Sequence, residues 1–272
     1  MIVSLDHKLK AWKIIYPIHL IENNVIKKSL LAIILCSLSI SVLASPKETI
    51  RFATEATYAP FESIDANNNI VGFDIDLANA ICKKLNANCA FTRQSFDSLI
   101  PSLKMRRFDA LMAGIDITPE RQKQVDFTDS YYNNSATFIA VKNKINKISL
   151  LKGKKVGVQN GTTHQKYISQ QHKEMQAIPY DNYQTAILDL QNGRIDAVFG
   201  DTAVTTEWLK TKGNENLAAV GKKITDANYF GVGLGIAVRK GNKTLLDKLN
   251  KAMAQLKQDG TYDAIYQKWL QK

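Results

Sequence analysis

An arginine lies in the first turn of a predicted helix at the end of the segment 109–121, which reads DALMAGIDITPER. Thr118 is a favourable N-cap and Pro119 suits the first helical position, so we expect the helix to begin there. A cation near a helix N-terminus opposes the helix dipole at a cost of about 0.3 kcal/mol, unless an anion lies beside it. We therefore predict an anion-binding site at Arg121. For this stretch alone, the alternative is an arginine side chain that reaches solvent.

Other polar residues follow predicted strands elsewhere in the chain. Ligands of open α/β sheets bind at the carboxyl ends of the strands, so we expect these side chains to converge. Together they offer a carboxylate site, an ammonium site and a second cation site flanked by aromatic rings, which suits a zwitterion with a basic side chain. The predicted binding residues are Glu55, Tyr58, Phe96, Asp116, Arg121, Thr163 and Asp201, with Gly114, Thr118 and Gln159 as further candidates. No catalytic residue is predicted.

One part of this site is assigned to the groups that all amino acids share. Arg121 can bind an α-carboxylate through two parallel hydrogen bonds, and the helix starts at Thr118 and Thr163 add free N–H groups. Asp201 suits the α-ammonium group. The alternative for Asp201 is a helix N-cap for the residues that follow it.

The remaining residues suit a cationic side chain. Tyr58 and Phe96 can sandwich a guanidinium group, which contributes up to about 2 kcal/mol when the cation is desolvated. Glu55 and Asp116 would neutralise the charge, because burial of an unpaired cation is costly. The alternatives are that the two aromatics are core residues and that Asp116 is an exposed turn acid.

Residues 1–44 are predicted to be a leader outside the folded domain. Lys27 and Lys28 precede an apolar stretch at 29–43 and the small residue Ala44, which is typical of a secretory signal peptide cleaved after about Ala44. The protein is then exported. The whole chain has a formal net charge of +11, but its lysines are spread along the sequence, so we predict no nucleic-acid partner.

The cysteines and histidines of the exported part allow two further predictions. Cys82 and Cys89 lie close together in the sequence, and in an oxidising compartment such a pair favours a disulfide, worth about 2 kcal/mol. Two buried thiols are the alternative. His164 and His172 stand eight residues apart without a third ligand, so we predict surface histidines and no metal site.

Strand-like apolar runs alternate with helical patterns after the leader, which predicts an α/β fold with mainly parallel sheets. The predicted strands are 49–53, 90–93, 110–113, 155–158, 196–199 and 233–238, and the predicted helices include 75–85, 97–105, 242–259 and 261–271.

A repeated pattern indicates two similar lobes. The segments 96–110 and 183–197 share apolar spacing and an Arg-x-Asp-Ala ending, as expected for a helix that leads into a strand in each lobe. We expect short crossings between the lobes at 133–136 and 231–233. Lobe 1 would then comprise 45–133 with 233–272, and lobe 2 would comprise 134–232.

From about residue 47 to residue 272, the chain resembles the periplasmic solute-binding proteins of polar amino-acid ABC importers, and most closely their arginine-binding members. This resemblance implies a type II periplasmic binding protein fold, in which two hinge-closing lobes trap an amino acid. It also implies a monomer without cofactor that delivers L-arginine or a related basic amino acid to an inner-membrane permease with its ATPase. The matching segments are 52–63 (FATEATYAPFES), 71–77 (VGFDIDL), 95–103 (SFDSLIPSL), 116–121 (DITPER), 156–165 (VGVQNGTTHQ) and 260–263 (GTYD).

The chain departs from lysine/arginine/ornithine and histidine binders of this kind at Ala113, Gly114 and Asp116, where those relatives carry serines. The additional acid favours arginine over neutral or smaller ligands. An enzyme on the same fold, such as a cyclohexadienyl dehydratase, is the main alternative, with Glu55 as its acid. A receptor sensor domain is a third possibility, but it needs a membrane segment after the lobes, and we expect none.

Overall fold

The computed structural model describes residues 46–271. The predicted leader and its cleavage site near Ala44 lie outside these residues. Residues 47–272 form one compact unit. In the described part of the chain, none of the helices has the length and apolar character needed to cross a membrane.

The structure has two five-stranded sheets, and the first strand of the described chain belongs to the first of them. Its strand order is β4-β1-β5-β12-β6. β1 pairs in parallel with β4 and β5, whereas β12 is antiparallel to β5 and β6, so four strands share one direction and β12 opposes them. The strands are β1 (Thr49–Thr54), β4 (Asn88–Arg93), β5 (Ala110–Leu111), β6 (Val125–Phe127) and β12 (Ala237–Arg239).

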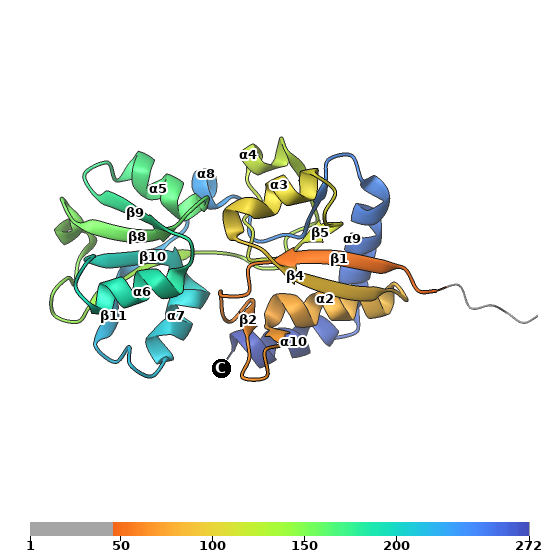
Figure 1. Cartoon of the computed structure of the whole chain (residues 1–272), viewed down its shortest axis with the longest axis horizontal. Coiled ribbons are helices and arrows are strands. Elements are labelled where there is room, and N and C mark those ends of the chain that lie inside the picture. Colours follow the sequence, from red (N-terminus) through yellow and green to blue (C-terminus); the bar gives the residue numbers. More distant parts are fainter. Residues whose placement is uncertain (1–45, 272) are drawn as a thin grey trace, which may run out of the picture. The chain divides into compact units, whose positions relative to one another are not determined.

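Helices cover both faces of this sheet (Figure 1). Helix α3 contacts β5 and β12 on one face, while α2 contacts β4, α9 and α10 on the other. Phe73, Leu77 and Ile81 form the buried stripe of α2, at the spacing that one helix face requires. The helices are α2 (Phe73–Lys84), α3 (Leu99–Lys104), α9 (Lys243–Gln258) and α10 (Thr261–Leu270).

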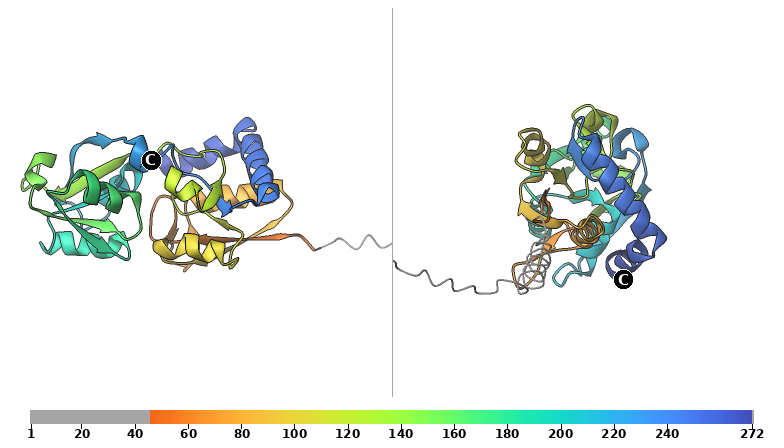
Figure 2. Two further views of the ribbon diagram at one scale, coloured as in Figure 1. Left: turned by 90° about the horizontal axis from the view of Figure 1, so that it is seen from above. Right: turned by 90° about the vertical axis from the view of Figure 1, so that its right-hand side faces the viewer.

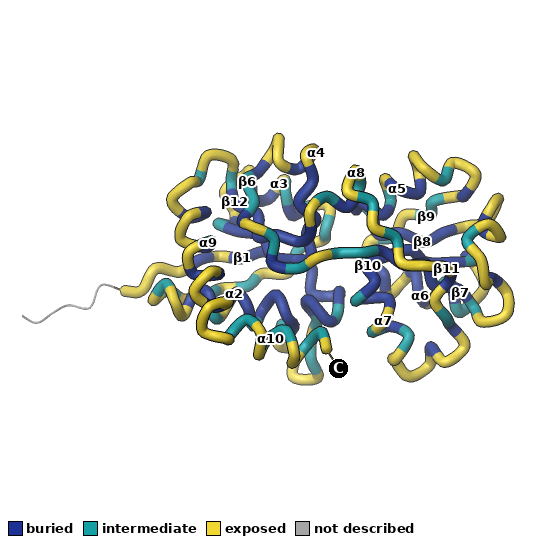
Figure 3. The backbone as a smooth tube through the Cα atoms, turned by 180° about the vertical axis from the view of Figure 1, so that it is seen from behind, coloured by how far each residue is buried: buried dark blue, intermediate teal, exposed yellow. Residues whose placement is uncertain are grey.

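The second sheet has the order β11-β7-β10-β8-β9. β10, β8 and β9 are parallel, and β7 is antiparallel to both β10 and β11, so again four strands share a direction. The sheet has its own helices (Figure 2), and its central strands are buried (Figure 3). Its elements are β7 (Ala136–Val141), β8 (Lys155–Gln159), β9 (Gln176–Tyr180), β10 (Ala197–Asp201), β11 (Leu217–Ile224), α5 (Thr163–Gln171), α6 (Tyr183–Gln191), α7 (Thr202–Lys210) and α8 (Ala227–Phe230).

The chain passes between the sheets twice, from β6 to β7 and from β11 to β12. On the second passage Gly231 has a φ of 63°, and a Cβ there would lie 1.8 Å from the carbonyl oxygen of Ile117, so glycine is required. The two-sheet α/β architecture and the repeated helix–strand pattern, α3 to β5 and α6 to β10, are confirmed. The lobe boundaries at 133/134 and 232/233 stay a prediction.

Several predicted elements differ in extent from the structure. The predicted strand 110–113 ends at Leu111, because Gly114 turns the chain at a φ of 55°. The predicted helix 97–105 is divided into a 3-10 turn, Phe96–Ser98, and α3. The predicted strand 233–238 begins only at Ala237, since Leu234 makes isolated bridges to Asp116 and Tyr132 instead.

Other local predictions are confirmed. Cys82 near the end of α2 and Cys89 in β4 form a disulfide. Gly260, with a φ of 79°, separates α9 from α10. A short hairpin of β2 (Ser63–Ile64) and β3 (Ile70–Val71) was not predicted.

Candidate ligand-binding site

Asp201 is the last residue of β10 and immediately precedes α7. The residue is buried, with 1% of its surface exposed. The Tyr58 hydroxyl donates to its Oδ2 at 2.8 Å, and Asn134 Nδ2 donates to its Oδ1 at 2.5 Å. His164 Nε2 lies 3.0 Å from the same Oδ1. Asp201 occupies the N-cap position of α7, but its side chain makes no cap hydrogen bond there. Its carboxylate instead binds groups from distant segments of the chain.

Asp116 is the second buried acid of the site, 3% exposed. Thr163 Oγ1 donates to its Oδ2 at 2.5 Å, and Asn134 Nδ2 donates to its Oδ1 at 2.9 Å. Burial and the nearby Asp201 carboxylate raise the pKa of Asp116 to about 6, although Arg121 opposes the shift. The alternative of an exposed turn acid is therefore wrong.

Arg121 lies in the one-turn helix α4 (Pro119–Gln122). Thr118 caps this helix by accepting from the Arg121 N–H at 3.2 Å, and Pro119 is in the first turn, as predicted. The guanidinium donates to the Asp116 carbonyl at 3.1 Å and to the Gly161 carbonyl at 3.4 Å. Arg121 is 8% exposed, so the solvent-reaching alternative is wrong. Burial lowers its pKa.

The two aromatic residues predicted to sandwich a ligand's guanidinium group pack against different neighbours, and the sandwich itself stays a prediction. The Phe96 ring lies under the Arg121 guanidinium, with 5.5 Å between the ring centroid and Cζ. Tyr58 stacks on Tyr183 at 5.5 Å between ring centroids. Tyr58 is buried in the hydrophobic core, whereas Phe96 is half-buried. Each ring nevertheless borders the cavity between the acids.

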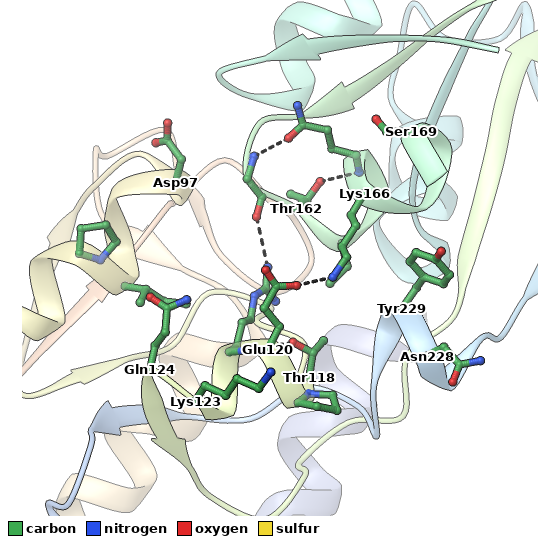
Figure 4. Close-up of a pocket in the computed structure, with 17 residues that line it drawn as sticks. Asp97, Thr118, Glu120, Lys123, Gln124, Thr162, Lys166, Ser169, Asn228 and Tyr229 are labelled. Carbon is green, nitrogen blue, oxygen red and sulfur yellow. Dashed lines mark hydrogen bonds and ion pairs between the residues drawn. The ribbon is translucent and has the colours of Figure 1, made fainter. Parts of the chain in front are cut away.

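All the predicted residues except Glu55 border a small cavity or an open groove. The cavity, of about 10 Å³, has room for about one water molecule. Arg121 and Thr163 line an adjoining groove of about 880 Å³. Thr118 borders the same groove (Figure 4). The cavity is lined by Tyr58, Phe96, Gly114, Asp116, Gln159, Thr162, Thr163, His164 and Asp201.

An ion pair crosses this groove (Figure 4). Lys166 Nζ in α5 contacts the Glu120 carboxylate in α4. The two side chains are 42% and 63% exposed, and solvent-exposed pairs contribute at most about 1 kcal/mol. The pair therefore adds little to the energy of the contacts between the two sheets.

Glu55 is separate from the other predicted acids. It follows β1, is 4% exposed, and accepts hydrogen bonds from the N–H and hydroxyl of Thr57. Burial raises its pKa, while Thr57 and Arg93 act in the opposite direction. Glu55 borders neither the cavity nor the groove. The structure thus brings the other predicted site residues together and leaves Glu55 outside them.

Two residues of the site were missed or misplaced by the sequence analysis. His164 was predicted to lie on the surface, but it is 2% exposed and borders the cavity; His172 is half-buried, 3.0 Å from Glu174. Asn134, between Asp116 and Asp201, was noted only as part of a crossing. Within residues 46–271, no group of three or more His, Cys, Asp or Glu side chains is arranged to hold a metal ion.

The chain is similar to proteins of a known family over nearly all of its described length. The model of bacterial extracellular solute-binding proteins, family 3, matches residues 50–272. A protein named as an ABC transporter arginine-binding protein of Escherichia coli K12 is 64% identical over 246 residues, covering 90% of this chain and 100% of that relative. The ABC transporter arginine-binding protein 1 of the same strain is 58% identical over 243 residues, covering 89% of this chain and 98% of the relative.

Solved structures show the same fold. A Salmonella typhimurium periplasmic binding protein described for its high arginine specificity has a TM-score of 0.79 and 48% identity, covering 82% of this chain and 99% of its own. An ancestral amino-acid-binding protein described as a precursor of cyclohexadienyl dehydratase has a TM-score of 0.74 and 35% identity, covering 82% and 95%. The fold is that of the type II periplasmic binding proteins, and the chain belongs to the family 3 bacterial extracellular solute-binding proteins.

Proposed function

We propose that this protein captures L-arginine between its two sheets in the periplasm and delivers it to an ABC permease with its ATPase. The observation that carries the proposal is the meeting of a buried arginine with two buried acids. Arg121 lies beside Asp116, and Asn134 connects that acid to Asp201 by donating a hydrogen bond to each carboxylate. One cation and two anions in a buried site complement the charges of a basic amino acid.

Entry of a ligand requires contacts between the sheets to open. The Tyr58–Asp201 and Thr163–Asp116 hydrogen bonds join chain segments that belong to different sheets. Tyr58 and Asp116 follow β1 and β5 of the first sheet, whereas Thr163 follows β8 and Asp201 ends β10 of the second. Each involves a carboxylate and is worth about 2 kcal/mol. The ligand's ammonium and guanidinium groups can replace these donors with charge-assisted bonds, so binding offsets the cost. The two crossings are the natural hinges for this motion.

The assignment within the site follows the charges. Arg121 and the free N–H groups of α5 bind the α-carboxylate, and Asp201 binds the α-ammonium. Asp116, with its additional charge near the cavity, favours a cationic side chain. Glu55 contributes to that preference as a fixed negative charge, rather than as a direct contact in the arrangement seen here.

Isothermal titration of residues 45–272, refolded free of co-purified ligand, tests the function. We expect one-to-one binding led by L-arginine, with L-lysine, L-histidine and L-glutamine weaker. Absence of heat with all of them would refute the proposal. The relatives' names support a binding protein, and we expect no turnover of a cyclohexadienyl substrate; turnover that Glu55→Gln abolishes would instead favour the enzyme.

A further inference from the structure

His164 is a buried polar side chain that the proposed binding scheme does not use. It is the second residue of α5 and only 2% exposed. Its imidazole lies 5.4 Å from each of the Phe199 and Phe230 ring centroids and 6.5 Å from that of Tyr183. An aromatic pocket stabilises an imidazole poorly unless a polar group faces it.

The polar group that faces His164 is Asp201. The distance from His164 Nε2 to Asp201 Oδ1 is 3.0 Å. Neither ring nitrogen makes an aligned hydrogen bond to a described residue, so in this geometry the contact is close but not directed. Asp201 Oδ1 already accepts from Asn134, and Oδ2 accepts from Tyr58.

The partners of Asp201 differ in how they depend on the arrangement of the sheets. Tyr58 belongs to the loop after β1, in the first sheet, whereas His164 belongs to α5, which follows β8. β8 pairs directly with β10, which carries Asp201. The contact to Tyr58 must therefore break when the sheets separate, whereas the contact to His164 lies within one layer and persists.

We propose that His164 is a positioning residue for Asp201. When Tyr58 withdraws, the Nε2–H of His164 donates to the Asp201 carboxylate and holds it in place for the ligand's α-ammonium group. A carboxylate fixed before binding loses less conformational entropy on binding, which raises affinity. This inference rests on the proposed function, because it requires that Asp201 binds an amino acid's ammonium group.

Variants that differ in the position of one donor test this role. In His164→Gln the amide nitrogen can lie where Nε2 lies, whereas in His164→Asn the shorter side chain places its polar groups near Nδ1. His164→Leu removes the donor. We expect the Kd for arginine to rise about tenfold in His164→Leu and His164→Asn, and at most threefold in His164→Gln. Citrulline, with the same α-ammonium group, should show the same ratios.

Controls separate this role from a structural one and from the proposed function. His172→Gln alters the other histidine of the described chain and should leave Kd unchanged. If His164→Leu does not fold, as judged by circular dichroism, the difference in Kd between the His164→Gln and His164→Asn variants tests the inference. Equal affinities in the Gln and Asn variants, or a loss for arginine but not for citrulline, would overturn the inference. Failure of the unmodified protein to bind arginine would instead refute the proposed function.

Discussion

Asp201 and Glu55 are both buried acids at the end of a strand, one in each sheet, yet their surroundings differ. Asp201 accepts hydrogen bonds from Tyr58 and Asn134, which are distant in the sequence. Glu55 accepts both of its hydrogen bonds from Thr57, two residues further on. An acid whose hydrogen bonds lie within its own loop keeps its orientation when the sheets move. An acid bonded across the sheets can lose its protein donors and accept hydrogen bonds from a ligand instead.

The largest effect expected from this comparison is at Asp201. In Asp201→Ala the Kd for every amino acid should rise at least about 30-fold, because loss of one partner of a buried charged pair costs at least about 2 kcal/mol. Titration calorimetry with arginine and citrulline measures it. The exposed acid Asp247, on α9, provides the control Asp247→Asn, for which we expect no change. Equal binding by Asp201→Ala and the control would contradict the assignment.

A smaller and selective effect is expected at Glu55. Glu55→Gln keeps the shape and acceptor of the side chain but removes its charge, so arginine should bind about tenfold more weakly and citrulline within twofold. The same pair of ligands is titrated. A matched loss for both ligands would show that Glu55 supports the fold or the shared groups rather than the ligand's cationic side chain.

Protonation of Asp116 should have a smaller effect on arginine affinity than the substitutions above. Burial and the nearby Asp201 raise the pKa of Asp116 to about 6. The ionised carboxylate attracts the guanidinium, so arginine affinity should fall several-fold as the pH is lowered from 7.5 to 5. Affinity for citrulline should fall less. In Asp116→Asn the difference between the two pH profiles should disappear; if it persists, another group produces it.

The smallest effect on binding is expected at the disulfide. Cys82 and Cys89 join α2 to β4 and do not line the cavity. The double variant Cys82→Ser with Cys89→Ser should lose about 2 kcal/mol of unfolding free energy in urea titration, while Kd stays within twofold. A large loss of affinity in a folded double variant would show that the disulfide between α2 and β4 influences the binding site.

The sequence predicted the α/β class, the α4 cap at Thr118 and most of the cavity lining, because these depend on local pattern and on the general position of sites at strand ends. It failed where tertiary contacts decide. α5 begins Thr-His-Gln-Lys, a polar pattern that gives no sign of the burial of His164. Asn134 has no periodic signal, and its role depends on two acids that meet only in the folded chain.

The most direct test of the central claim, that buried acids select a cationic amino acid, compares arginine with citrulline on the unmodified protein at pH 7.5. Citrulline has the same backbone groups and nearly the same shape, but its side chain is neutral. Titration calorimetry should give an arginine Kd at least tenfold below that of citrulline. Equal dissociation constants would contradict the account, because the acids would then contribute nothing to ligand choice.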